Sequence, residues 1–573
     1  MGLTSSNQTA NKALKTLGRH AENHIASVLD ENNPIAPILC IDNLDFEQRI
    51  HSKSLGNDSQ MFHGTWGYIH QIDRALLSSV SPSNLTLESY LSKMEEIPSL
   101  VVSPKMLISS PEDEKHWVLV LKSQIAKVLL TYIAKPAEKR TTIAITPPTI
   151  EQISHKPPDI TMIKLMIASD NSAQGIGEVC TGIIQQSNLD ETEFSSRLQV
   201  MDGDLATCAN IQSLQSQRVP SEYSADTITN LLTLLGGSHT LWNIGLAIFE
   251  LHYGNTSDSR DCGAWRWLDS LGIPSTKTLD KKDFTKMIQN MEKIHEATIV
   301  YCIMCVMGIQ NSSLTDQLLS LPGKTIESII DKTYHQYFSA RAKSKAAKSA
   351  SPKHSNLLLR LGDFASIIEG NRAMKSGDIG RLMNMWKRWS VIAIGVTKLR
   401  QYAIQLPRMI ILLNHVLPAG LSKIIRHSLL IAPSGRQRHF VAKDYFLEHQ
   451  NCWLKYIFNQ TGRGTEIDRL KDLYSTNVQT MLIQKLATDS GAVHIFYSHH
   501  NKIDLKSMNN CLRMTRANNI LLDYSKTNIP LTRLLPQAII TWKDGALLKE
   551  PNSDDSESEK SSDGSQSSGL IEL

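Results

Sequence analysis

The sequence predicts a mixed α/β fold in which a small sheet is interrupted by a large α-helical insertion. Two short apolar runs, Pro37 to Asp42 and Leu198 to Asp204, have the length of buried strands, and each ends at an acidic residue. From Leu241 to about Leu430 the apolar residues instead recur three and four positions apart, which is typical of helices. The change of period near Leu241 therefore separates a sheet-forming part from a helical part.

The other elements of the first part follow from the same periodicities. Helices are expected at Asn11 to Asp30, His116 to Ala134 and Leu205 to Gln215. Further strands are expected at Gln60 to His70, Thr141 to Thr146 and Asn230 to Leu235. We expect these strands to join the two apolar runs in one sheet, with His239 at the end of the fifth strand.

The chain has 573 residues, which is more than one hydrophobic core usually holds. We divide it into an N-terminal helical segment (1–36), the first part of the core (37–240), the helical insertion (241–430), a region that completes the core and continues as helices (431–550), and a disordered acidic, Ser-rich tail (551–573). The tail cannot bury enough apolar surface to fold.

Charge is distributed unevenly along the chain. The formal net charge is +4, but residues 551–573 hold six acids against one lysine. Without this tail, 59 basic and 50 acidic residues remain, a net charge of +9. A basic body is compatible with nucleic acid as a partner, and DNA is the partner that we expect. Protein partners are left open, and a homo-oligomer is one option.

The sequence favours an intracellular location, with the nucleus as one option. The eight cysteines are scattered without a disulfide framework, which is typical of a reducing compartment. No run approaches the ~18 apolar residues of a membrane span. No partnership with a membrane is therefore expected.

Three acidic residues stand in contexts that suit metal-dependent phosphodiester chemistry. Asp42 and Asp204 follow strand-like runs, and Glu448 lies in a helical segment. Hard divalent cations such as Mg²⁺ or Mn²⁺ prefer oxygen ligands, and a pair of them can clamp the attacking and leaving oxygens of a phosphoryl transfer. We predict these acids as the catalytic and metal-binding residues. Asp45 and Asp202 lie close enough in sequence to exchange roles with them.

Each acid also has a simpler explanation. Asp42 and Asp204 could cap a turn or a helix, and Glu448 could be a solvated helix residue. Asp444 lies four positions before Glu448, so either could face the site. His239, His449 and Asn451 are candidates for supporting positions around the acids.

The order of several motifs resembles a known family. These motifs are Ile41-Asp42-Asn43-x-Asp45-Phe46, Gly203-Asp204-x-x-Thr207, Gly236-Gly237-Ser238-His239, 373–381 (AMKSGDIGR) and 444–451 (DYFLEHQN). Together they resemble an uncharacterised transposon-derived family known as domain of unknown function 6589. The resemblance extends from about Pro37 to Asp472.

The resemblance implies a link to DDE-type transposases with a ribonuclease-H-like core. In such cores the first Asp lies on the first strand, the second at the end of the fourth, and the final acid on a late helix. Asp42, Asp204 and Glu448 match these positions in order. The sequence departs from the family pattern after Asp204, where Leu205 and Ala206 replace Gln and Leu, and before His239, where Gly237 and Ser238 replace Asp and an aromatic residue.

Two function classes follow. The first is a transposase-derived, metal-dependent protein that cleaves phosphodiester bonds or transfers strands on DNA. The alternative is a catalytically inactive, domesticated remnant that binds nucleic acid or protein, as the departures would suggest.

Between Arg341 and Arg360 there are six basic residues and no acid, so Lys343, Lys345 and Lys348 are the predicted nucleic-acid contacts. A solvated basic segment is the simpler explanation. A helical scaffold without a nucleic-acid role would predict no metal binding.

Overall fold

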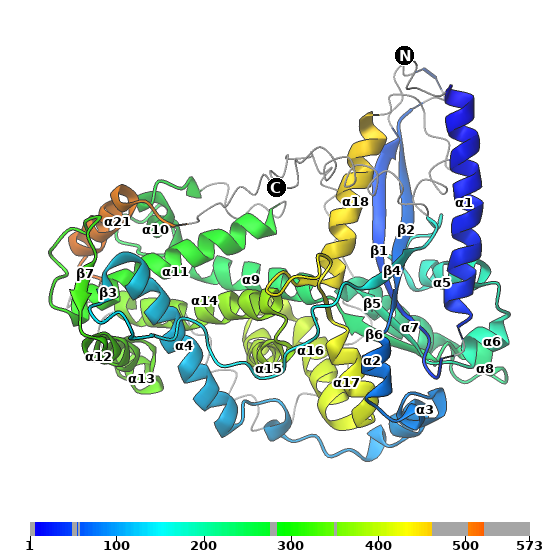
Figure 1. Cartoon of the computed structure of the whole chain (residues 1–573), viewed down its shortest axis with the longest axis horizontal. Coiled ribbons are helices and arrows are strands. Elements are labelled where there is room, and N and C mark those ends of the chain that lie inside the picture. The colour runs from blue at the N-terminus through cyan, green and yellow to red at the C-terminus, as the bar shows by residue number, and fades with distance from the viewer. Residues whose placement is uncertain are drawn as a thin grey trace.

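The computed structural model describes residues 6–31, 33–48, 54–55, 58–275, 283–348, 352–460 and 502–520. It is a mixed α/β structure in which a five-stranded sheet adjoins a larger body of helices (Figure 1). The strands of the sheet are β1 (Ile38–Gln48), β2 (Gln60–Gln71), β4 (Asp159–Met162), β5 (Gln199–Gly203) and β6 (Leu231–Leu235). Their order is β4-β2-β1-β5-β6.

The pairing of β1 leaves part of one side of this central strand without a strand partner. β1 pairs antiparallel with β2 from Ile38 to Gln48. It pairs parallel with β5 only at Leu39 and Cys40, whereas β5 and β6 pair in parallel along their whole length. β1 therefore continues past the end of β5, and Asp42 lies in this continuation.

Helices cover both faces of the sheet. On one side are α1 (Asn7–Leu29), α5 (Ala173–Ser187) and α7 (Leu205–Arg218), and on the other α18 (Lys443–Gln460) runs beside β1 and β2 (Figure 1). The ring of Phe446 on α18 packs edge-on against Tyr68 of β2, with 5.5 Å between the ring centroids. Because side chains alternate along a strand, Cys40 and Asp42 face the side of β1 that α18 covers.

The helical body is built from helices that pack around a shared apolar core. Its main members are α4 (Pro111–Tyr132), α9 (Gly237–Tyr253), α10 (Ala264–Ser270), α11 (Phe284–Val306), α12 (Gly323–Thr333), α13 (Ala340–Ala347), α14 (Pro352–Ser376), α15 (Ile379–Gly395), α16 (Tyr402–Ile411), α17 (Ala419–His427) and α21 (Leu505–Ala517). One apolar cluster joins Ile38, Val200 and Leu234 of the sheet to the interior of these helices, so sheet and body share a core.

Short elements connect the main ones. They are α2 (Arg74–Ser78), α3 (Leu87–Glu95), α6 (Glu191–Ser195), α8 (Ser224–Thr227), β3 (Ala134–Pro136), β7 (Leu319–Leu321), β8 (Leu430–Ile431) and β9 (Val441–Ala442), with the 3₁₀ turns η1 (Pro82–Asn84), η2 (Ile97–Ser99), η3 (Pro104–Met106) and η6 (Thr397–Leu399) and the π-helical turns η5 (Tyr334–Phe338) and η7 (Leu412–Val416). β3 and β7 form a small parallel pair within the helical body, and the β8–β9 hairpin leads into α18.

Most predicted elements are confirmed, including the single sheet that contains both Asp-bearing runs. The strand predicted at Thr141 to Thr146 is wrong, because this segment has no strand pairing and its even-numbered residues are exposed. β4, which follows Pro157-Pro158, occupies the edge of the sheet instead. His239 does not end a strand either: β6 stops at Leu235, and His239 lies in the first turn of α9.

In the part of the chain that the structure describes, no helix is both long and apolar enough to cross a membrane.

Candidate carboxylate site

The three predicted acids come to the same edge of the sheet. Asp42 lies on β1, and Asp204 directly follows β5, which runs parallel to β1. Glu448 is carried there by α18. Burial raises the pKa of Asp42, the charge of His239 lowers it, and the charges of Asp204 and Glu448 raise it, so that the pKa is about 8. Asp204 and Glu448 are therefore both close enough to Asp42 for their charges to act on it.

Asp42 is held by hydrogen bonds from two asparagines. Its Oδ1 accepts the backbone N–H of Asn43 at 2.9 Å, and its Oδ2 accepts Nδ2 of Asn451 on α18 at 3.3 Å. Asn451 is only 4% exposed, so the predicted supporting role is compatible with its position. The sequence of α18 thus places both Glu448 and Asn451 against β1.

Asp204 has the helix-capping role that was its simpler explanation. Its Oδ1 accepts the backbone N–H of Thr207 at 2.7 Å and so caps α7. Capping uses one carboxylate oxygen, and it fixes the side chain at the end of β5. The charge of Asp204 also acts on Asp42, so the cap and the site are compatible roles for one residue.

Asp444 and Glu448 have different surroundings although they lie one helical turn apart. Asp444 accepts the backbone N–H groups of Ser238 and His239, at 3.2 and 2.8 Å, and Nδ1 of His239 at 3.0 Å. It therefore supplies a hydrogen-bond acceptor to the free N–H groups in the first turn of α9, whose own N-cap residue is a glycine without a side chain that could do so. The charge of Glu448, by contrast, raises the pKa of Asp42.

His239 contributes positive charge to the site. Burial disfavours the charged imidazole, but the hydrogen bond and charge of Asp444, together with the charges of Asp42 and Glu448, raise the pKa of His239 to about 10. The imidazolium faces carboxylates on two elements. It partly compensates the negative charge that these acids bring together.

The two acids that could have exchanged roles with the predicted ones have other partners. Asp202 is 1% exposed, and its Oδ2 lies 3.3 Å from Nζ of Lys443, which is also fully buried. Asp45 accepts Nδ2 of Asn43 at 3.0 Å and lies 2.8 Å from Nδ1 of His63. Asp202 therefore belongs to a buried ion pair with Lys443, and Asp45 to a group with Asn43 and His63.

A fourth carboxylate, Asp170, was not predicted. It lies in the loop between β4 and α5 and is 2% exposed. Burial raises its pKa, the hydrogen bond from Thr207 lowers it, and the charges of Asp204 and Asp45 raise it, so that the pKa is about 6. Its charge also acts on Asp42. The only signal in the sequence is a polar tetrapeptide, Ser169 to Ser172, between an apolar run and a helix.

Several buried oxygens around the acids lack a hydrogen-bond donor within the described residues. They are Oδ1 of Asp170, Oδ1 of Asn451 and Oδ1 of Asn43. A buried acceptor without a donor is costly, and oxygens of this kind are the ligands that Mg²⁺ and Mn²⁺ prefer. No three His, Cys, Asp or Glu side chains in the described ranges, however, already form a group that could hold a metal ion.

The other predicted residues are His449 and the lysines of the basic segment. The ring of His449 is 6.5 Å from that of Tyr445, and burial lowers its pKa. Lys345 and Lys348 are exposed in and after α13. Lys343 leans on α14, where its Nζ approaches Gly362, and burial lowers its pKa. Arg360, at the end of the basic segment, is buried with its guanidinium over Trp267.

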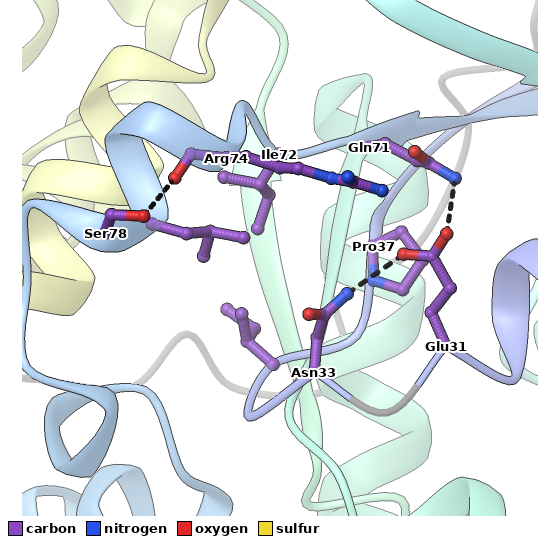
Figure 2. A pocket seen from close by; sticks show the side chains of 9 residues that line it. Glu31, Asn33, Pro37, Gln71, Ile72, Arg74 and Ser78 are labelled. Carbon is purple, nitrogen blue, oxygen red and sulfur yellow. Dashed lines mark hydrogen bonds between the residues drawn. The ribbon is translucent and has the colours of Figure 1, made fainter.

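A cavity of about 340 Å³ at the N-terminal end of β1 is separate from this site (Figure 2). Its walls come from the segment before β1 and from the end of β2 and α2. Gln71 and Asn33 both donate to the Glu31 carboxylate across it, at 3.3 and 3.1 Å. None of the predicted residues lines this cavity.

Comparison with known families gives a match to the Family of unknown function (DUF6589), over residues 98–490. This range covers more than half of the chain. The chain belongs to this family. The match includes Asp170, Asp204, His239 and Glu448, whereas Asp42 lies before it. Neither the curated proteins nor the solved structures contain a match to the chain.

Proposed function

We propose that this member of the family is a transposase-derived protein that cleaves or joins phosphodiester bonds of DNA with the help of Mg²⁺ or Mn²⁺. The observation that carries the proposal is the convergence of Asp42, Asp204 and Glu448, from two parallel strands and a late helix, on a place where buried oxygens lack donors.

The placement of the acids also agrees with what the resemblance to DDE-type transposases and their ribonuclease-H-like core implies. Asp42 lies on the first strand of the five-stranded sheet, and Asp204 follows the fourth of its strands in chain order. Glu448 lies on a helix that follows the helical body. A ribonuclease-H-like core is accordingly part of the proposal.

The side chains suggest a division of roles. Two bound cations would activate water or a DNA 3′-hydroxyl and stabilise the leaving oxygen. Asp42 and Asp204 would hold these ions from the strand ends, and Glu448 would complete the site from α18. His239, oriented by Asp444, would keep positive charge beside the acids, and Asn451 would fix the Asp42 carboxylate. An intracellular protein that meets DNA in the nucleus fits this proposal.

One observation favours the alternative, a catalytically inactive remnant that binds nucleic acid or protein. The acids are neighbours but do not form a ready coordination group among the described residues, and His239 already compensates part of their charge. This arrangement could persist without any metal ion. The two functions differ in whether Mg²⁺ or Mn²⁺ binds at Asp204.

The deciding experiment uses Asp204→Asn. Asparagine is as good an N-cap as aspartate, so the variant keeps α7 and removes only the charge. We expect Mn²⁺ to raise the melting temperature of the wild-type chain and to support nicking of supercoiled plasmid, and the variant to lose both effects.

The matched control is Asp190→Asn, which makes the same change at the N-cap of α6. It should behave as the wild-type chain does. If Asp204→Asn retains the full Mn²⁺-dependent shift, or if the wild-type chain shows none, the enzymatic proposal is wrong and the binding-protein alternative takes its place.

A further inference from the structure

Three segments that are distant in sequence meet at the β8–β9 hairpin, which immediately precedes α18. The segments are 152–158, 373–377 and 432–442. The backbone N–H of Ile153 donates to the carbonyl of Gly377 at 2.9 Å, and that of Phe440 donates to the carbonyl of Lys375 at 3.3 Å. These bonds join the three segments into one surface, which we call the hairpin surface.

The hairpin surface is basic. Its three segments contain no acidic residue, and their Lys and Arg side chains are all exposed: Lys156, Lys375, Arg436 and Arg438. The charge of Lys156 is compensated by Asp73, whose Oδ2 lies 2.8 Å from Nζ. The two arginines and Lys375 therefore supply most of the positive charge. A guanidinium group can bind phosphate oxygens with two parallel hydrogen bonds.

Two residues of the β8–β9 loop have a left-handed backbone. They are Gly435, with φ 66°, and Arg438, with φ 63°. A Cβ at Gly435 would stand 2.8 Å from Cγ of Pro157, so glycine suits both the conformation and the close approach. Arginine is disfavoured in this conformation, because its Cβ crowds the following carbonyl oxygen. Strained residues of this kind occur preferentially where a protein holds a ligand.

The hairpin is held firmly next to the helix that carries Glu448. Phe440 is 2% exposed, and a Cβ at Gly377 would stand 2.6 Å from its ring, so the ring lies directly against this glycine. β9 then continues into α18, where Asp444 accepts the backbone N–H of His239 at 2.8 Å. Glu448 follows one helical turn later. The hairpin surface thus adjoins the start of the helix that completes the carboxylate site.

We propose that the hairpin surface binds the phosphate backbone of duplex DNA beside the carboxylate site, with Arg436 and Arg438 as the main contacts. The inference rests on the proposed function, because it names the surface that holds the DNA on which that site acts. A protein that acts on one phosphodiester bond has to hold the strand near that bond. Phosphate contacts of this kind position DNA without reading its sequence.

The test is a fluorescence anisotropy titration of a short duplex with the full chain at several salt concentrations. EDTA is present, so that no divalent ion contributes to binding. Arg436→Gln combined with Arg438→Gln should reduce the slope of log K against log salt by about two units. Lys139→Gln combined with Arg140→Gln is the matched control, because it removes the same charge from an exposed loop after β3. This control should leave the slope unchanged.

Arg438→Asn separates a phosphate contact from a role in shaping the loop. Asparagine tolerates the left-handed conformation better than arginine does, so this variant should melt at the same temperature as the wild-type chain or higher. Its salt slope should nevertheless fall by about one unit. If the slopes of Arg438→Asn and of the double arginine variant both equal that of the wild-type chain, the inference is overturned. It is also overturned if these variants bind polyglutamate less tightly but DNA normally, since the surface would then suit an acidic protein segment.

The outcomes distinguish this inference from the proposed function. If the arginine variants keep the wild-type slope while the wild-type chain nicks plasmid with Mn²⁺, the proposed function stands and the hairpin surface has no part in it. If the variants lose slope but the wild-type chain nicks no DNA, the surface stands and the binding-protein alternative replaces the enzyme. A wild-type chain that binds no duplex at low salt would overturn both.

Discussion

The carboxylate of Asp444 accepts two hydrogen bonds from His239, one from the backbone N–H at 2.8 Å and one from Nδ1 at 3.0 Å. The first residue lies at the start of α18 and the second at the start of α9. A single side chain therefore caps one helix, orients an imidazole and ties together two elements that are distant in sequence.

Replacing Asp444 should cost considerable stability. In Asp444→Asn the second oxygen becomes an NH₂ group, which cannot accept from His239, and the ion pair is lost from a side chain that is 4% exposed. Breaking a buried pair of this kind typically costs about 3 kcal/mol. Urea unfolding at pH 7 would measure the difference. Asp504→Asn, at the N-cap of α21, is the control, and an equal loss in both variants would contradict the assigned role.

Gly236 should not tolerate a side chain. A Cβ at this position would stand 2.5 Å from Oδ2 of Asp444. Gly236→Ala should therefore displace Asp444 and lower the free energy of unfolding by about 1–3 kcal/mol, the usual cost of overpacking. Gly177→Ala is the control, because its Cβ would meet the flexible end of Arg218 at 3.3 Å and Leu214 at an ordinary contact distance of 3.7 Å. That change lies inside α5 and should be neutral or stabilising.

The basic segment should contribute to DNA binding through its exposed lysines. Each phosphate contact changes the slope of log K against log salt by about one unit. Lys345→Gln with Lys348→Gln should therefore reduce the slope by about two units, measured by fluorescence anisotropy on duplex DNA. Lys343→Gln should change it less, because this side chain leans on α14. If the slope is unchanged in both the double variant and Lys343→Gln, the segment is only a solvated surface.

Glu292 should make the stability of the helical body depend on pH. Its carboxylate lies 2.7 Å from Nη2 of Arg372 and 3.4 Å from Nζ of Lys127. Burial acts to raise the pKa of Glu292, but these cations lower it from 4.5 to about 2. The folded chain thus holds the proton less tightly than the unfolded chain.

The stabilisation by Glu292 is therefore complete above about pH 5 and is lost as the pH falls toward 2. About 2 kcal/mol should be lost by pH 3. Glu292→Gln should lack this part of the pH dependence, in denaturant titrations at pH 6 and pH 3. The exposed Glu95→Gln should keep it, and parallel behaviour of the two variants would show that the ion pairs of Glu292 contribute little.

The sequence predicted the parts of the fold in which pattern and burial agree. Apolar runs such as Ile38 to Ile41 are buried on both faces, so their composition alone marks them as strands. β4 has only four residues, too few to establish a period, whereas Thr141 to Thr146 alternates but remains outside the sheet. Alternation of apolar and polar residues along a segment does not show which segment pairs with the edge of the sheet.

The candidate site was predictable where a strand or a helix carries the acid. Asp444 and Glu448 share a helix face, so only the neighbouring first turn of α9 distinguishes their roles. Asp170 follows no regular element. Its burial depends on Thr207 and Asn210, which lie 37 and 40 residues away, and no local pattern contains that information.

The separation between the two halves of the site also sets an order of events during synthesis. Ser238 and Asp444 lie 206 residues apart. At ~5–20 residues per second, roughly ten to forty seconds pass between the synthesis of the first turn of α9 and that of the first turn of α18. Throughout that interval the nascent chain has Asp42 and Asp204 but neither Glu448 nor the partner of His239, so any activity that depends on the complete set begins only after α18 has been synthesised.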